Sequence, residues 1–572
     1  MFTVQYGLDG AGFGEYVMLL TVSALSFVII FAMTYLYFQI IKNNTHPKPK
    51  RLKGAIHNVF LILAFVSHPL ILNLNSIYKS RYAEQSNDFD QYYKTPNIIG
   101  QKAKDLNIVY IYAESLEKTY FDESIFPSLV NNLKELKSKS TEFTNINQIA
   151  GSEWTIGGMV SSQCSIPLFT ESGGNSGGNS MSGSDTFLKG AECLGDVLKN
   201  LGYHLAYIQG SSVEFSGLNH FYDSHHFDEI YGSDELKDHL NDPTYINGWG
   251  LYDDTLFSIV FDKFELLSEQ DKPFALFMAT MDTHHPDGQT SKSCNNIPYG
   301  KGENSILNAV HCSDKLISEF IKKIQNSKYA NNTLIVLTSD HLAMQNTATQ
   351  LLVKGERRNL FLIFDPNNKQ YMPIKKAGSM QDVAPTVLHK LGINTELGLG
   401  RNLFDQESLY ISFNKLFNNY NEKLRSWRKS ILKLWEFPKI SKTSYSIDLE
   451  KKEVAIAEHS YRFPVLFKID STQYLAPMFE DPYATKKYYE NLIDKFTPVE
   501  KFIWIGSCDK INHVFDHNFS DVYCVAQGSL AGKVEVAALQ KNMLDINISH
   551  MLNDTKIDMT QYNARLKKIL NP

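Results

Sequence analysis

The sequence has no large excess of charge of either sign. Its 56 Lys and Arg residues and 62 Asp and Glu residues give a formal net charge of −6 at pH 7. Proteins that bind DNA or RNA through the phosphate backbone usually carry a basic surface. The composition therefore gives no support for a nucleic acid partner.

Cysteine is scarce, with six residues in a chain of 572, and no two of them form a C-x-x-C pair. This count excludes a small disulfide-dense scaffold, and the missing pair removes the usual signal for structural zinc. Six is nevertheless an even number, so up to three disulfides are open to a domain that is exported from the cytoplasm.

The sequence also lacks the composition of a disordered chain. Hydrophobic residues make up 43%, aromatic residues 12% and charged residues 21% of it. Such a chain has enough apolar side chains to build packed cores. Its length predicts about three to four domains at roughly 150 residues each.

Residues 17–41 contain no charged side chain over 25 positions. At about 1.5 Å per residue, a helix of this length crosses a hydrocarbon core of about 30 Å. We therefore expect a transmembrane helix at 17–41. A second candidate, residues 55–73, is diluted by two histidines, an asparagine and a proline, so a buried hairpin or an interfacial segment remains the alternative.

The charges around these two segments predict their orientation. The connection between them carries five basic residues, at positions 42, 48, 50, 51 and 53, whereas residues 1–16 carry only Asp9 and Glu15. The positive-inside rule places this connection in the cytoplasm and everything after residue 75 on the other side. A cleavable signal peptide is not expected, because a basic start is missing and the apolar run is too long.

After a polar linker at 76–104, short apolar runs alternate with helical periodicity. The runs lie at 106–112, 203–209, 273–280, 333–338 and 359–364, and the clearest helical patterns at 193–201 and 306–324. This alternation predicts an α/β domain, residues 105–430, with a mostly parallel sheet sandwiched by helices. Residues 431–572 have short alternating segments instead, at 445–447, 453–456, 465–469, 502–505 and 522–525, which predict a small β-rich domain.

Ligands of open α/β sheets bind beyond the carboxyl ends of the strands. The side chains expected there include Glu114, Gln209, His284, Asp340 and His341. Carboxylates and an imidazole suit a divalent ion, and such an ion activates a hydroxyl nucleophile. Thr155 is the hydroxyl that we expect at this place, because it begins a Thr-Ile-Gly-Gly segment whose helix start would face an anionic group.

Each of these signals has a plain structural alternative. The Asp340–His341 pair could be a hydrogen-bonded turn, Thr155 a helix cap, and His284 with His285 a pair on the surface. Trp249 could be a core or rim aromatic residue rather than a wall of the substrate site. Their joint order along the chain favours the functional interpretation.

That order resembles the sulfatase-like branch of the alkaline phosphatase superfamily. A Glu after the first strand is followed by Trp-Thr-x-Gly-Gly, then Thr-His-x-Pro, then Ser-Asp-His. Within this branch the chain is most similar to the phosphoglycerol transferase I family, which decorates osmoregulated periplasmic glucans and is related to lipoteichoic acid synthases. The similarity extends from about residue 5 to about residue 535 and includes 113–120 (AESLEKTY), 163–168 (QCSIPL), 193–196 (CLGD), 249–254 (WGLYDD), 340–344 (DHLAM) and 398–401 (GLGR).

The resemblance implies roles for single residues. Glu114, Thr155, Asp340 and His341 match the metal ligands, with Thr155 also the nucleophile. His284 matches the histidine that contacts the phosphoryl group of the substrate, and we add Trp249 and Gln209 as substrate-binding residues. A formylglycine nucleophile is not expected, because neither Cys-x-Pro-x-Arg nor Ser-x-Pro-x-Arg occurs.

The cysteines are consistent with this family and with an exported domain. We expect disulfides between Cys164 and Cys193, between Cys294 and Cys312, and between Cys508 and Cys524. The alternative is six free, buried cysteines.

The resemblance implies a metal-dependent transferase anchored in the inner membrane, with its catalytic domain in the periplasm. It would move phosphoglycerol from phosphatidylglycerol through a threonine intermediate to a periplasmic glucan, releasing diacylglycerol. Manganese is the expected metal, with magnesium and zinc as alternatives. A phosphoethanolamine transferase or a phosphodiesterase would use the same residues, and a binding module on an inactive fold is the non-enzymatic alternative.

Overall fold

The structure is a computed structural model that describes residues 34–35, 39, 85–172, 179, 181–240, 242–415, 419–440, 442–479 and 496–570. The predicted transmembrane segments, 17–41 and 55–73, lie outside the described residues except for positions 34, 35 and 39. Within the described part of the chain, no helix combines the length and the apolar character that crossing a membrane requires. The chain divides into two units, residues 1–86 with 421–426 and residues 87–420 with 427–572, and the second is described here.

An eight-stranded sheet forms the centre of the α/β part, in the order β5-β4-β6-β1-β7-β8-β2-β9. The predicted apolar runs are confirmed as five of these strands: β1 (Asn107–Ala113), β4 (His204–Gln209), β6 (Phe274–Ala279), β7 (Thr333–Ser339) and β8 (Phe361–Phe364). Three shorter strands complete the sheet: β2 (Thr141–Phe143), β5 (Glu229–Tyr231) and β9 (Met372–Ile374). A separate pair consists of β3 (Ile146–Asn147) and β10 (Gly378–Ser379).

The sheet is mixed: most of its strand pairs are parallel, as predicted, but one strand runs in the opposite direction. Strands β5, β4, β6, β1 and β7 are parallel, whereas β8 runs antiparallel to both β7 and β2. Residues 340–360, between β7 and β8, contain one short α-helix, α13 (Thr349–Leu352), and no long crossover helix. Because no long helix carries the chain back to the other edge of the sheet, β8 starts at the carboxyl edge of β7 and therefore runs antiparallel to it.

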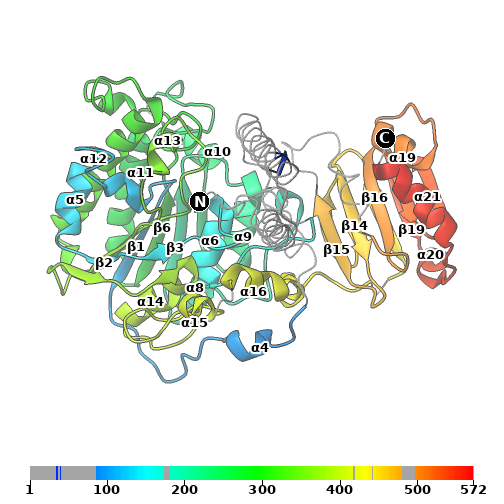
Figure 1. Cartoon of the computed structure of the whole chain (residues 1–572), viewed down its shortest axis with the longest axis horizontal. Coiled ribbons are helices and arrows are strands. Elements are labelled where there is room, and N and C mark those ends of the chain that lie inside the picture. Colours follow the sequence, from blue (N-terminus) through cyan, green and yellow to red (C-terminus); the bar gives the residue numbers. More distant parts are fainter. Residues whose placement is uncertain are drawn as a thin grey trace. The chain divides into compact units, whose positions relative to one another are not determined.

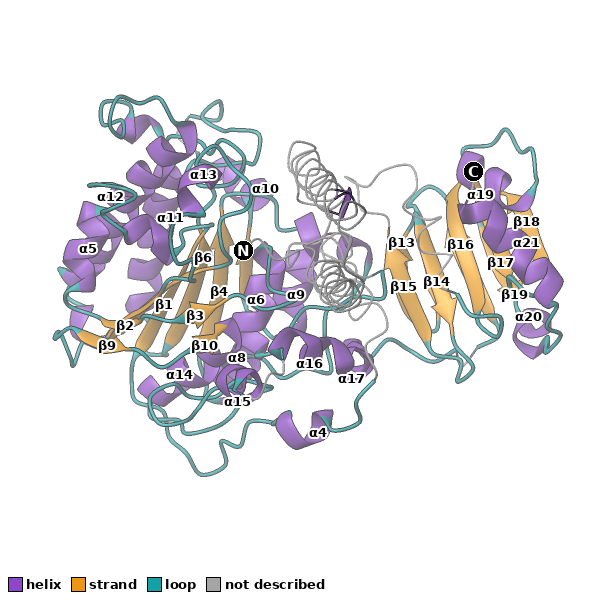
Figure 2. Cartoon of the chain, viewed as in Figure 1, coloured by secondary structure: helices purple, strands orange, loops and turns teal. Residues whose placement is uncertain are grey.

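Helices cover both faces of the sheet (Figure 2). On one face, apolar side chains of the strands form one hydrophobic cluster with α5 (Asn131–Lys137), α11 (Asp253–Ser268) and α12 (Ser305–Gln325). On the other face lies α6 (Thr155–Cys164), which contacts α8 (Leu194–Asn200) and α14 (Val383–Lys390). The remaining helices before residue 440 are α4 (Phe89–Tyr92), α9 (Leu218–Ser224), α10 (Ser233–Leu236), α15 (Leu409–Asn414), α16 (Tyr420–Ser426) and α17 (Arg428–Leu432).

The register of the parallel strands decides which residues meet at their carboxyl ends. Tyr112 of β1 pairs with Ala279 of β6 and with Thr338 of β7. The residues that follow these strands are therefore neighbours in space, although they are far apart in sequence. Burial on both faces explains why β1 and β7 consist of uninterrupted buried positions rather than alternating ones.

The C-terminal segment is β-rich, as predicted, and contains two antiparallel sheets (Figure 1). One has the order β13-β12-β11-β19, formed by β11 (Ser444–Asp448), β12 (Glu453–Ile456), β13 (His459–Arg462) and β19 (Met543–Asn547). The other has the order β15-β14-β16-β17-β18, formed by β14 (Val465–Ile469), β15 (Leu475–Phe479), β16 (Lys501–Ser507), β17 (Tyr523–Gly528) and β18 (Val534–Ala538). Its helices are α19 (Cys508–Phe515), α20 (Ser549–Asn553) and α21 (Met559–Leu570).

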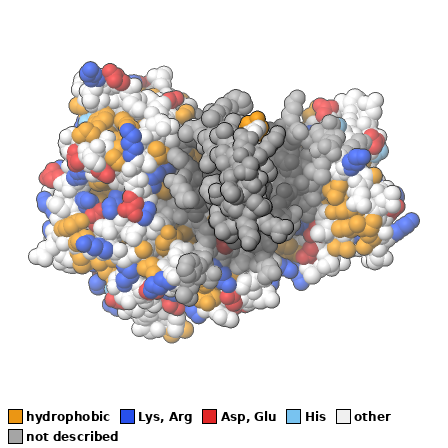
Figure 3. All heavy atoms as spheres, viewed as in Figure 1, with side chains coloured by type: hydrophobic (Ala, Val, Ile, Leu, Met, Phe, Trp, Pro, Cys, Tyr) orange, Lys and Arg blue, Asp and Glu red, His pale blue; other side chains and the backbone are white. Residues whose placement is uncertain are grey.

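Charged side chains of both signs are interspersed over the described part of the surface in Figure 3. This distribution agrees with the near balance of acidic and basic residues in the sequence.

Candidate active site

The structure brings Glu114, Asp340 and His341 together at the carboxyl ends of β1 and β7. One ligand atom from each of the three side chains lies within 4.8 Å of the others. The His341 Nε2 atom is 3.6 Å from Glu114 Oε1 and 3.3 Å from Asp340 Oδ2. All three side chains are about 1% exposed, so this is an interior group of charges at a strand edge.

The hydrogen bonds of His341 determine its neutral tautomer. Its Nδ1 atom lies 2.8 Å from the carbonyl oxygen of Leu342, and a carbonyl oxygen can only accept. The proton of the neutral ring is therefore on Nδ1, and the lone pair of Nε2 points toward the two carboxylates. A backbone carbonyl that fixes a histidine in this way is the usual outer partner of a metal-binding imidazole.

Asp340 has hydrogen bonds at one carboxylate oxygen and none at the other. Its Oδ1 atom accepts the backbone N–H groups of Ser115 and His341, both at 2.9 Å. Its Oδ2 atom is buried and has no hydrogen bond. Burial, together with the charge of Glu114, raises the pKa of Asp340 to about 7. Burial is also the largest cause of a raised pKa at Glu114.

These observations fit a divalent cation. A carboxylate oxygen without a hydrogen bond, an imidazole lone pair and a second carboxylate converge on one place, and all of them attract positive charge. The donors are two hard carboxylates and one nitrogen, which suit manganese, magnesium or zinc.

Thr155 is the first residue of α6 and lies beside this group. Its Oγ1 atom is 3.3 Å from Glu114 Oε2, and its side chain is partly exposed. Gly158, one turn further along α6, allows this approach: an added Cβ atom would lie only 1.9 Å from the backbone oxygen of Asp340. The absence of a side chain at Gly158 therefore lets the helix pack directly against the end of β7.

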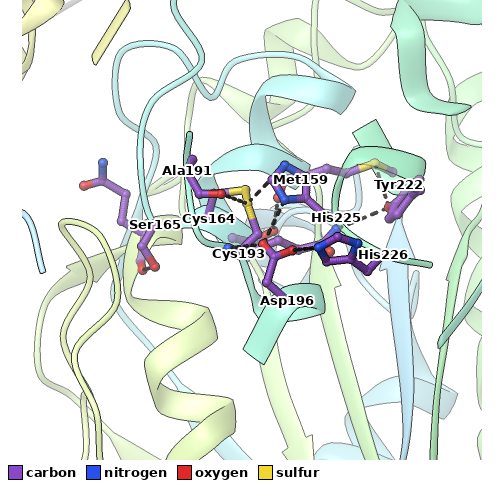
Figure 4. Close-up of a disulfide and its surroundings, with 12 residues drawn as sticks. Met159, Cys164, Ser165, Ala191, Cys193, Asp196, Tyr222, His225 and His226 are labelled. Carbon is purple, nitrogen blue, oxygen red and sulfur yellow. Dashed lines mark hydrogen bonds and ion pairs between the residues drawn. A yellow bond between two sulfur atoms is a disulfide. The ribbon is translucent and has the colours of Figure 1, made fainter. Parts of the chain in front are cut away.

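The other end of α6 is fixed by a disulfide between Cys164 and Cys193 (Figure 4). Cys193 precedes α8, and its backbone N–H donates to Asp196, which also bonds the buried His225 at 2.9 Å. Closing a loop of this length stabilises a fold by roughly 3 kcal/mol in the chain-entropy model. The disulfide therefore anchors the helix that carries Thr155.

The other two predicted pairs are also present, Cys294 with Cys312 and Cys508 with Cys524. No cysteine is free, so the alternative of six free thiols is wrong.

His284 follows β6 and is held by its neighbours. Its Nδ1 atom donates to the carbonyl oxygen of His285 at 2.8 Å, and its ring centre is 4.1 Å from that of Trp249. Burial lowers the pKa of His284, so the ring is neutral near pH 7 with its lone pair on Nε2. Trp249 is partly exposed and thus lies at the rim of this region, next to His284.

Gln209 differs from the other predicted site residues because its side-chain amide is fully used by hydrogen bonds to nearby residues. Its side chain is 1% exposed, and its amide is bonded to Tyr207 at 2.5 Å and to the backbone oxygens of Ser211 and Ser212. The structure therefore places Gln209 at the end of β4, as predicted, but commits its amide to internal bonds.

Glu117 is a residue whose part in the site we did not predict. It is fully buried, accepts the backbone N–H of Ala343 at 2.9 Å and pairs with Arg357. Gln148 likewise accepts the N–H of Leu342 at 2.6 Å. Together they hold the loop that follows His341. A charged residue four positions after a strand was the available signal, but its partner is 240 residues away in sequence.

Three family models match separate parts of the chain, and curated relatives match 99% of it. The family model described as Sulfatase matches residues 106–393, and two models described as Phosphoglycerol transferase I match 1–85 (N-terminal domain) and 443–569 (middle domain). Curated proteins named Phosphoglycerol transferase I from Escherichia fergusonii and Salmonella newport are 36% and 37% identical to it, each over 99% of this chain and 72% of the relative.

Solved structures with a similar chain include the lipoteichoic acid synthase LtaP from Listeria monocytogenes. It is 17% identical, with a TM-score of 0.46, over 63% of this chain and 97% of that chain. The relatives at 36% and 37% identity decide the assignment: this chain belongs to the phosphoglycerol transferase I family and is a phosphoglycerol transferase enzyme of the sulfatase-like alkaline phosphatase superfamily.

Proposed function

We propose that the chain transfers phosphoglycerol from phosphatidylglycerol to a hydroxyl of a periplasmic glucan, with Thr155 as the covalent carrier. In the first step, Thr155 Oγ1 attacks the phosphorus of the lipid, and the bond between phosphorus and the diacylglycerol oxygen breaks. The proton of Thr155 ends on that oxygen, so diacylglycerol is released. In the second step, a glucan hydroxyl attacks the same phosphorus, the bond to Thr155 breaks, and Thr155 regains a proton.

The observation that carries this proposal is the buried group of three possible metal ligands beside Thr155. Asp340 Oδ2 has no hydrogen bond, His341 Nε2 presents a lone pair, and Glu114 accepts from Thr155 at 3.3 Å. A divalent ion held by Glu114, Asp340 and His341 would lower the pKa of the Thr155 hydroxyl and offset the charge that develops at phosphorus. The oxygen-rich donor set makes manganese our first choice of metal.

His284 is proposed to move the protons of both steps. Because its Nδ1–H is held by the carbonyl of His285, its Nε2 atom is the one that accepts or returns a proton. Its lowered pKa keeps it neutral, and therefore able to accept, near pH 7. Trp249 forms the proposed rim of the substrate site next to this ring.

The membrane arrangement belongs to the same proposal. Residues 1–75, with spans at 17–41 and 55–73, would anchor the enzyme in the inner membrane and keep the catalytic domain, 105–430, close to its lipid donor in the periplasm. Residues 76–104 would be the linker, and 431–572 the β-rich C-terminal domain.

Transfer of label from phosphatidylglycerol carrying radioactive glycerol phosphate to a β-glucan tests this function. We expect purified full-length enzyme with Mn²⁺ to label the glucan, and removal of divalent ions by a chelator to stop labelling until Mn²⁺ is restored. Phosphatidylethanolamine labelled in its head group is the matched control and should give no labelled glucan.

Three other results would contradict the proposal. Labelled glycerol phosphate in water without labelled glucan would identify a hydrolase. Transfer from the phosphatidylethanolamine control would identify a different donor. No turnover of either lipid by metal-loaded protein would support a binding module instead.

A further inference from the structure

The segment from Trp249 to Asp253, which we call the strap, crosses the carboxyl ends of β4 and β6. It starts after a turn in which Asn247 Oδ1 accepts the backbone N–H groups of Trp249 and Gly250, at 2.8 and 3.2 Å. The backbone N–H of Leu251 then donates to the carbonyl oxygen of Gly210, directly after β4, at 2.8 Å. These bonds fix the path of the strap over the sheet edge.

Gly250 makes this close crossing possible. Its φ is +138°, and an added Cβ atom would lie 2.1 Å from the oxygen of Gly210. The strap is therefore a tightly fitted segment rather than a loose connection.

The strap contacts the His284 loop, residues 280–285, at two points. Trp249 packs its ring against the His284 ring with their centres 4.1 Å apart. Asp253, the first residue of α11, is fully buried, and its two carboxylate oxygens accept the N–H groups of Met281 and Asp282 at 2.8 and 3.1 Å.

This second contact lies immediately before the functional part of the loop. Thr283, the next residue, donates its hydroxyl proton to the backbone oxygen of Glu114, and the N–H of His284 donates to the carbonyl of Met281 at 3.0 Å. His284 is thus only two residues beyond the backbone that Asp253 holds. The same loop is also hydrogen-bonded, through Thr283, to Glu114 of the metal-binding group.

We propose that Asp253 is a positioning residue, which acts through its two bonds to the His284 loop and not by contact with substrate. This inference rests on the proposed function of His284. Each carboxylate oxygen of Asp253 accepts one N–H group, whereas an amide in the same place has an acceptor on only one side and a hydrophobic side chain has none. Loss of one bond would let His284 move, and small displacements of a positioned group are costly in catalysis.

The test is a double-mutant cycle between Asp253→Asn and His284→Ala in full-length enzyme with Mn²⁺. Asp253→Asn alone should lower kcat about 10- to 100-fold and change KM by less than about threefold. In the His284→Ala background, the same change should lower kcat by less than about twofold, because two residues that act through one another are not additive.

Asp262→Asn is the matched control, since it makes the same chemical change at an exposed position of the same helix, α11. It should leave kcat within about twofold of the unchanged enzyme. Equal losses from Asp253→Asn in both backgrounds, or no loss at all, would overturn the inference, and so would weaker Mn²⁺ binding, which would indicate damage to the metal group.

Two further measurements keep the inference testable. If Asp253→Asn does not fold, Asp253→Glu replaces it in the cycle, because it keeps a carboxylate but displaces both acceptor oxygens, and the same non-additivity with His284→Ala is expected. If the unchanged enzyme turns over no phosphatidylglycerol, the proposed function fails separately, and hydrogen exchange decides the inference. Asp253→Asn should then speed amide exchange at residues 281–284 relative to Asp262→Asn, and unchanged exchange would overturn it.

Discussion

Replacing Thr155 with alanine is expected to reduce transfer of phosphoglycerol by about 10⁴- to 10⁶-fold, because removing a nucleophile leaves only binding and electrostatic effects. The hydroxyls of Thr155 and Ser115 both donate to the Glu114 carboxylate, at 3.3 and 2.8 Å, and of these two Thr155 is the one that begins a helix, α6. Initial rates of glucan labelling with saturating Mn²⁺ measure the effect.

Thr155→Ser is the matched variant for this experiment. It keeps the hydroxyl and removes one methyl group, so we expect it to retain activity within about 100-fold of the unchanged enzyme. Both variants should keep the thermal stability of the fold, since Thr155 is partly exposed. Transfer by Thr155→Ala at more than about a tenth of the normal rate would rule out Thr155 as the carrier.

Gly158→Ala should also lower the rate of transfer, by less than Thr155→Ala, for a reason that is steric and not chemical. The new Cβ atom would lie 1.9 Å from the backbone oxygen of Asp340, so α6 must move away from the end of β7. Overpacking of this kind costs about 1 to 3 kcal/mol in stability, and the displaced helix carries Thr155 with it. We expect kcat to fall about 100-fold or more.

Gly248→Ala is a suitable control, because an added Cβ atom at that position meets nothing within 4 Å. Thermal denaturation and kcat should be measured for both variants. A Gly158→Ala enzyme with normal kcat would show that the close packing of α6 against Asp340 does not position the nucleophile.

The sequence was sufficient to predict the strands that build the site and the residues that follow them. Uninterrupted apolar runs predicted β1, β4, β6 and β7, because strands that are covered on both faces need no polar positions. Glu114, Asp340 and His341 meet because they follow neighbouring parallel strands, which is a geometric consequence of the sheet. The direction of β8 was not predictable from its own apolar residues, since the pattern is the same for parallel and antiparallel buried strands.

The sequence was not sufficient to identify the residues that hold the site in place. Glu117 and Asp253 are acidic residues near a strand end and a helix start, and nothing in their local pattern shows that they are fully buried. Their partners, Arg357 and the backbone of residues 281–282, are distant in the chain, so only the folded structure reveals the bonds. Gln209 shows the converse case, because a polar residue at a strand end can be used entirely by its own loop.

The measurement that tests the account most directly is the detection of the covalent intermediate. Enzyme with Mn²⁺ is mixed with phosphatidylglycerol in the absence of glucan, quenched in acid, digested and analysed by mass spectrometry. The account predicts that the peptide containing Thr155 gains the mass of one phosphoglycerol group, that the gain disappears when glucan is added, and that it does not form without metal. A modified residue other than Thr155, or glucan labelling by an enzyme that never carries the group, would contradict it.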